Sequence, residues 1–193
     1  PGKDPKTRIS IDENFNHAAV FIAHAAPSMG EPIGLKLDWL CLCLDADAHH
    51  IKTGHPIFSY PYPVNLTLTT KDTPEGVYHY PSGVNVPKQI LMWRVQTEGY
   101  LEAKGYRVGM VSRSSGFLDT PDTEYISSGV NTKSVEAVAI GRQANFFLWG
   151  FSASPDYMTE EANDVFANAV VYMKQFKGQK PITKKTHLVD RSY

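Results

Sequence analysis

The sequence predicts an α/β domain with a mixed β-sheet, an antiparallel C-terminal β-hairpin and one long terminal helix. Two observations predict this class. Residues 135–142 (VEAVAIGR) and 145–151 (NFFLWGF) are strand-like runs separated by only two residues, a spacing that favours an antiparallel pair. Apolar residues then recur at helical spacing from Ala162 to Phe176, which is typical of a helix with one buried face.

The ends of this helix are also marked in the sequence. Thr159 is expected to cap it with its hydroxyl, and Glu160 and Glu161 follow in the first turn, where the helix dipole favours negative charge. Gly178 and Pro181 come after the last apolar residue and are expected to end the helix.

Both faces of the second hairpin strand carry large apolar side chains. Phe147 and Trp149 alternate with Phe146 and Leu148 along the run, so each pair points to one face of the sheet. A strand that is covered on both faces lies inside a sheet, and we therefore expect an inner position for this hairpin.

The rest of the chain adds shorter elements around the hairpin. Strands are expected at 17–24, 40–44, 64–70, 77–80, 90–97 and 106–112, with the turn residues 71–76 joining the third of these strands to the fourth. Segments 45–58 and 114–122 are polar or rich in turn residues, and we expect them to be loops.

Length and composition favour one folded domain over residues 1–193. Residues 1–17 are expected to form a peripheral lead-in and residues 179–193 a C-terminal arm. A hydrophobic fraction of 42% indicates a folded chain. The net charge of −1 lacks the positive excess that nucleic-acid binding requires. The longest apolar stretch, 18–26, is too short to span a bilayer.

The two cysteines and the first residues bear on the cellular compartment. Cys41 and Cys43 are two positions apart, where a disulfide would be strained, so we expect two small apolar core residues. The polar start, PGKDPKTR, is typical of a processed end and slightly favours an exported or periplasmic protein.

Residues 135–176 resemble the C-terminal end of class I glutamine-amidotransferase-like domains and their ThuA-like relatives, which are linked to sugar metabolism. The likeness lies in the Gly/Arg-containing turn, the strand ending in Trp-Gly-Phe, and the helix TEEANDVFANAVVYM. The segment His55-Pro56-Ile57 is similar to a loop of that family, so the resemblance covers 45–176 at most. It implies a trimmed or diverged member, or a fragment of a longer precursor.

The amidotransferase activity itself does not carry over. That chemistry needs a cysteine nucleophile on a sharp turn flanked by glycines, and neither Cys41 nor Cys43 has a glycine neighbour. The resemblance therefore implies a scaffold without the family's nucleophile.

The densest polar cluster predicts a candidate metal site. Asp45, His49, His50 and His55 follow a predicted strand, and imidazole and carboxylate groups are ligands for Zn²⁺ or another divalent transition metal. Their spacing matches no established zinc motif, and a solvated loop remains the alternative. A metal-dependent hydrolase or oxidoreductase is the enzyme hypothesis that this cluster supports.

Tyrosines next to prolines predict a second candidate site. Tyr60, Tyr62, Tyr78 and Tyr80 could form a platform for a carbohydrate-like ligand through ring stacking and directed hydrogen bonds. The alternative is a covered sheet edge or a contact in a homo-oligomer or larger assembly. Our leading hypothesis is a ThuA-like domain that binds a carbohydrate-like ligand or a protein partner, and a structural assembly subunit is the third.

An acid–base group is also conceivable from the sequence. Asp119, Asp122 and Glu124 lie in and after a loop near Arg113, and such carboxylates could polarise a substrate. Surface salt bridges are the commoner outcome for such a group.

Overall fold

A computed structural model describes residues 2–3, 10–11, 15–22, 41–74, 87–98, 109–114, 117, 120–132 and 134–182. The main strands are β3 (Ala19–Ile22), β5 (Asp47–His49), β6 (Leu68–Asp72), β7 (Gln89–Arg94), β9 (Thr123–Gly129), β10 (Val138–Gln143) and β11 (Phe146–Trp149). Two small sheets pair β1 (Gly2–Lys3) with β2 (Ser10–Ile11) and β4 (Cys41–Leu44) with β8 (Gly109–Val111). The helices are α1 (Glu160–Met173) and the short 3₁₀ turns η2 (Pro56–Phe58), η4 (Pro155–Tyr157) and η5 (Lys174–Phe176).

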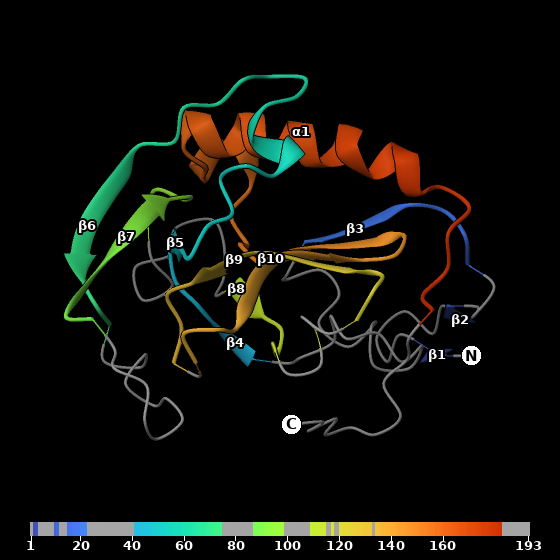
Figure 1. Ribbon diagram of the computed structural model, residues 1–193, viewed down its shortest axis with the longest axis horizontal. Coiled ribbons are helices and arrows are strands. Elements are labelled where there is room, and N and C mark those ends of the chain that lie inside the picture. The colour runs from blue at the N-terminus through green and yellow to red at the C-terminus, as the bar shows by residue number, and fades with distance from the viewer. Residues whose placement is uncertain are drawn as a thin grey trace.

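The main strands form one seven-stranded mixed sheet in the order β3-β11-β10-β9-β5-β7-β6. The β3–β11 pair is parallel, and the other neighbours are antiparallel. Helix α1 runs along one side of this sheet, with the β4–β8 pair on the other side (Figure 1). The predicted fold class, a mixed sheet with a C-terminal hairpin and a long terminal helix, is confirmed.

The C-terminal hairpin occupies the inner position that its two apolar faces predict. Strand β11 lies between β10 and β3, and every residue of both hairpin strands is buried. Gln143 is opposite Phe146, so the turn residues are Ala144 and Asn145, one position later than the sequence indicates. Ala144 has a φ of 47°, a left-handed conformation that tight hairpins require.

Helix α1 begins where its capping residue predicts. The Thr159 hydroxyl accepts a hydrogen bond from the backbone N–H of Ala162 at 3.2 Å. The α-helix ends at Met173, and the last predicted turn is the 3₁₀ turn η5. Gly178 follows with a φ of 91°, the left-handed conformation with which helices commonly end. The buried side of α1 shares one apolar core with Phe147 and Trp149 of β11.

Two strands of the main sheet lie in segments without a strand prediction. Strand β5 lies in the predicted loop 45–58 and is buried throughout, and β9 follows the predicted loop 114–122. β5 pairs with β7 on one side and β9 on the other, so its backbone groups are satisfied inside the sheet. The loop prediction for 45–58 is wrong at β5, because tertiary pairing overrides the polar sequence.

The remaining strand predictions are confirmed only in part. β6 begins at Leu68 rather than at Val64 and pairs with β7. Its predicted partner, 77–80, lies outside the described residues. Cys43 of β4 is buried, as expected, and it is disulfide-bonded, which the short spacing of the two cysteines did not favour.

Candidate functional site

The four residues predicted as metal ligands do not form one site. The Asp45 carboxylate accepts a hydrogen bond from the backbone N–H of Ala46 at 2.7 Å. His49 and His50 contact each other, whereas His55 caps η2 and faces the carboxylate of Glu124. Across the described residues, no three His, Cys, Asp or Glu side chains are grouped so that they could hold a metal ion.

The tyrosine prediction leads to a pocket between the segment around η2 and the C-terminal half of α1. Tyr60 is 68% exposed and lines this pocket, which has a volume of about 490 Å³. The other lining residues are Pro56, Val171, Tyr172, Lys174 and Gln175. We call this the Tyr60 pocket. Tyr62 is exposed and is not among the lining residues, and Tyr78 and Tyr80 lie outside the described part of the chain.

Asn168, a buried side chain of α1, fixes the segment that carries Tyr60. Its Nδ2 donates to the carbonyl oxygens of Ile57 at 2.9 Å and Tyr62 at 2.7 Å, and its Oδ1 accepts from the backbone N–H of Tyr62 at 2.9 Å. One amide therefore satisfies three backbone groups on both sides of Tyr60. This arrangement fixes the backbone on both sides of Tyr60.

Replacement of Asn168 by Ala is expected to lower the free energy of unfolding by about 2 kcal/mol, because it leaves buried backbone groups without partners. Urea denaturation measures this loss. Asn163→Ala is the matched control on the same helix, since Asn163 makes one exposed hydrogen bond to the carbonyl of Pro155. Equal losses of unfolding free energy in the two variants would contradict the role of Asn168 in holding the segment that carries Tyr60.

A second group of side chains meets at the Glu124 carboxylate, beside the Tyr60 pocket. Glu124 lies on β9 and accepts from Arg142 Nε of β10 at 2.7 Å. It also accepts from the Tyr172 hydroxyl at 2.9 and 3.0 Å and faces His55 Nε2 at 3.4 Å. The Arg142 guanidinium stacks over the Phe176 ring at 3.9 Å. We call these contacts the Glu124 cluster; it joins the segment before η2, the sheet and α1.

The contacts in the Glu124 cluster shift the pKa values of its members. Burial acts to raise the pKa of Glu124, but hydrogen bonds from His55, Arg142 and Tyr172, together with the Arg142 charge, lower it to about 2. Burial and the neighbouring Glu124 charge raise the pKa of the Tyr172 hydroxyl to about 12. Glu124 is therefore a carboxylate and Tyr172 a neutral donor at neutral pH.

The geometry makes His55 a brace between segments. Its Nε2 faces Glu124, and its Nδ1 accepts from the backbone N–H of Ile57 at 3.4 Å. Because both ring nitrogens face groups of the protein, His55 lacks a nitrogen directed at a ligand. A structural role is the one that these contacts favour.

The structure describes the predicted acid–base group only in part. Glu124 pairs with Arg142, and Asp122 accepts from the backbone N–H of Ile182 at 2.7 Å. Asp119 lies outside the described residues. The predictions also missed Asn168 and Tyr172, although their spacing of four positions places them on the same side of α1.

A further polar pair, His49 and His50, lies at the end of β5. His49 is fully buried, and its Nδ1 is 2.7 Å from Nδ1 of His50. Burial and the neighbouring His50 lower the pKa of His49 to about 3. Burial also lowers the pKa of His50, against the opposing effect of Glu136. Both imidazoles are therefore neutral at neutral pH.

Asp47, earlier on the same strand, belongs to a separate ion-pair group. Its carboxylate binds Lys71 Nζ at 2.8 Å and an Arg94 nitrogen at 2.9 Å. These ion pairs join β5 to β6 and β7, so the role of Asp47 is structural.

Comparison with protein-family models, with curated proteins and with solved structures finds no match to this chain. In the part of the chain that the structure describes, none of the helices has the length and apolar character needed to cross a membrane.

Proposed function

We propose that this protein is a non-amidotransferase relative of the ThuA-like group that binds a carbohydrate-like ligand in the Tyr60 pocket. The observation that carries the proposal is the lining of that pocket. It combines an exposed tyrosine ring with a second tyrosine, an ammonium group and an amide.

Such a lining suits a sugar ring. Apolar C–H faces of a sugar stack on aromatic rings, and its hydroxyls need hydrogen-bonding groups nearby. Tyr60 and Tyr172 supply the rings, while Lys174 supplies donors and Gln175 can supply both donors and acceptors. A volume of about 490 Å³ is sufficient for a small ligand.

The surroundings of the pocket favour binding. The Tyr172 hydroxyl is held by Glu124, and the segment that carries Tyr60 is held by Asn168. A site that is ordered in advance loses less conformational entropy when a ligand binds. His55 and Glu124 face groups of the protein itself, which favours a binding role over acid–base catalysis.

Replacement of Tyr60 by Ala is expected to weaken carbohydrate binding about tenfold, because the stacking face is removed. A glycan array identifies the ligand, and calorimetry measures its dissociation constant. Tyr62→Ala is the matched control, since Tyr62 is also exposed and its contacts with Asn168 involve only its backbone. An array without a bound glycan, or equal affinity for wild type and Tyr60→Ala, would overturn the proposal.

A further inference from the structure

The segment between η2 and β6 contains an acceptor triplet for N-linked glycosylation, Asn65-Leu66-Thr67. It is the only Asn-x-Ser/Thr triplet in the sequence. Residues 63–67 form an irregular segment along which burial alternates. Val64 and Leu66 pack against the apolar core, whereas Asn65 between them is exposed. The Asn65 side chain is therefore accessible to solvent, as the attachment of a bulky glycan requires.

The cysteine chemistry of the chain fits the compartment in which such glycans are added. Cys43 is disulfide-bonded, and the described residues include no free cysteine. Disulfides form and persist in oxidising compartments, such as the lumen of the endoplasmic reticulum, and are rare where thiols are kept reduced. The disulfide is thus an observation, separate from the triplet, that favours passage through a secretory pathway.

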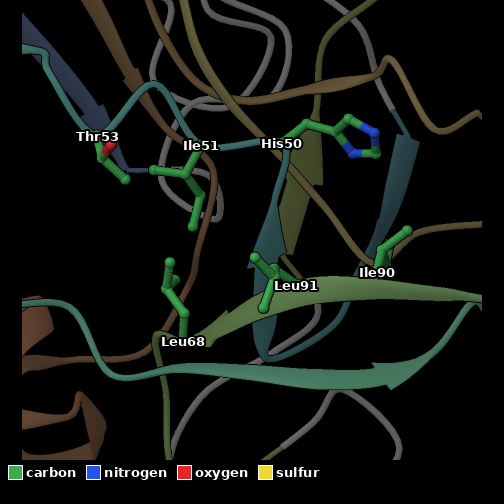
Figure 2. Close-up of a pocket in the computed structure, with 6 residues that line it drawn as sticks. All are labelled: His50, Ile51, Thr53, Leu68, Ile90 and Leu91. Carbon is green, nitrogen blue, oxygen red and sulfur yellow. The ribbon is translucent and has the colours of Figure 1, made fainter.

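The surface next to the triplet has a need that a glycan meets. Strand β6 begins three residues after Asn65 and is the last of the described strands at its end of the main sheet. Leu68 of β6 is 39% exposed and Leu91 of β7 is 55% exposed. Figure 2 shows both side chains facing Ile51 across a pocket of about 300 Å³. A terminal strand with exposed aliphatic side chains invites pairing with other chains and aggregation.

We propose that Asn65 carries an N-linked glycan, which keeps other chains away from the β6 end of the sheet. Three residues of extended chain span about 10 Å, so a bulky, hydrated glycan on Asn65 excludes other chains from the neighbourhood of Leu68. In the transfer, Asn65 Nδ2 bonds to C1 of the first sugar of a lipid-pyrophosphate-linked oligosaccharide. The bond from C1 to the pyrophosphate oxygen breaks, the lipid pyrophosphate leaves with the electron pair, and the amide releases one proton.

The contacts of Thr67 place this transfer before folding. The triplet is recognised through the hydroxyl at its third position, but in the folded chain the Thr67 hydroxyl and backbone N–H both donate to the Glu161 carboxylate. Glu161 is 94 positions later in the chain, so the glycan is added to the nascent chain before this contact forms. The contact holds Thr67 at the first turn of α1, whereas the Tyr60 pocket lies at the other end of the helix. The proposal is independent of ligand binding in that pocket.

Peptide mapping of the protein purified from its native source tests the modification. Trypsin cleaves after Lys52 and Lys71, so Asn65 lies in the peptide 53–71. This peptide is expected to carry the additional mass of a glycan. Peptide N-glycosidase is expected to remove that mass and to convert the asparagine to aspartate. A native peptide 53–71 with an unmodified Asn65 would overturn the proposal.

Variants secreted from eukaryotic cells check the acceptor and the role of the glycan. Thr67→Ser keeps the triplet and is expected to keep the glycan, whereas Thr67→Ala is expected to lose it. Asn65→Gln also loses the glycan and is expected to aggregate faster than the wild type in light scattering. Adding Leu91→Ser to Asn65→Gln is expected to slow this aggregation, because it removes an exposed aliphatic side chain. Equal aggregation of the wild type and Asn65→Gln would contradict the protective role.

Discussion

Replacement of Glu124 by Gln is expected to lower the free energy of unfolding by about 3 kcal/mol, because it removes the charge that neutralises a buried arginine. The Arg142 side chain is only 8% exposed, and Glu124 is its ion-pair partner at 2.7 Å. Gln can still accept hydrogen bonds from Arg142 and Tyr172, so the main loss is electrostatic. Chemical denaturation measures the effect as a lower midpoint with an unchanged m value.

The control for this variant is a second Glu→Gln replacement. Glu136 is exposed and accepts one hydrogen bond, from the Ser114 hydroxyl at 3.3 Å. Glu136→Gln is expected to change the free energy of unfolding by less than about 0.5 kcal/mol. A loss in Glu124→Gln as small as in this control would show that the Glu124 cluster does not stabilise the fold.

The second large effect is a loss of stability in acid caused by His49. In the unfolded chain this histidine titrates near pH 6.5, whereas in the folded chain its pKa is about 3. Between these values the unfolded state binds more protons, so stability falls as the pH falls. We expect a loss of about 2 to 3 kcal/mol from pH 7 to pH 4.5 attributable to His49.

Denaturation curves recorded across this pH range measure how the free energy of unfolding changes with pH. The Gln side chain of His49→Gln cannot take up a proton, so this variant is expected to lose most of the pH dependence. His17→Gln removes an exposed histidine and is expected to keep the pH dependence of the wild type. NMR titration of the folded wild-type chain gives an independent check, because the His49 ring should stay neutral at pH 4.5. A His49 ring that protonates near pH 6.5 in the folded chain would contradict the expectation.

The C-terminal hairpin and helix could be predicted because their signals are local. The alternation of Phe146 to Trp149 and the cap at Thr159 are visible within a few residues. Strand β5 was not predicted because it has only three residues and a polar sequence, Asp-Ala-His. β5 is a strand because it pairs with β7 and β9. Both partners are distant in the sequence, so the residues around β5 do not reveal this pairing.

The candidate sites were predictable to a smaller extent. Tyr60 was found because it belongs to a local pattern in which tyrosines alternate with prolines over residues 60–63. The Glu124 cluster was not found, since its residues come from positions 55, 124, 142 and 172 and meet only in the folded chain. Asn168 looked like an ordinary helix residue, and its role depends on carbonyl groups 111 and 106 positions away.

The parallel pairing of β3 with β11 has a consequence for the order of folding during synthesis. Asn145, in the hairpin turn, holds the segment before β3 by donating to the His17 carbonyl, 128 positions earlier in the chain. Strand β3 therefore emerges from the ribosome long before β11, its partner among the described strands, exists. Contacts of such long sequence separation form slowly. This apolar segment stays exposed until the last third has been made, and chaperone dependence is expected to centre on it.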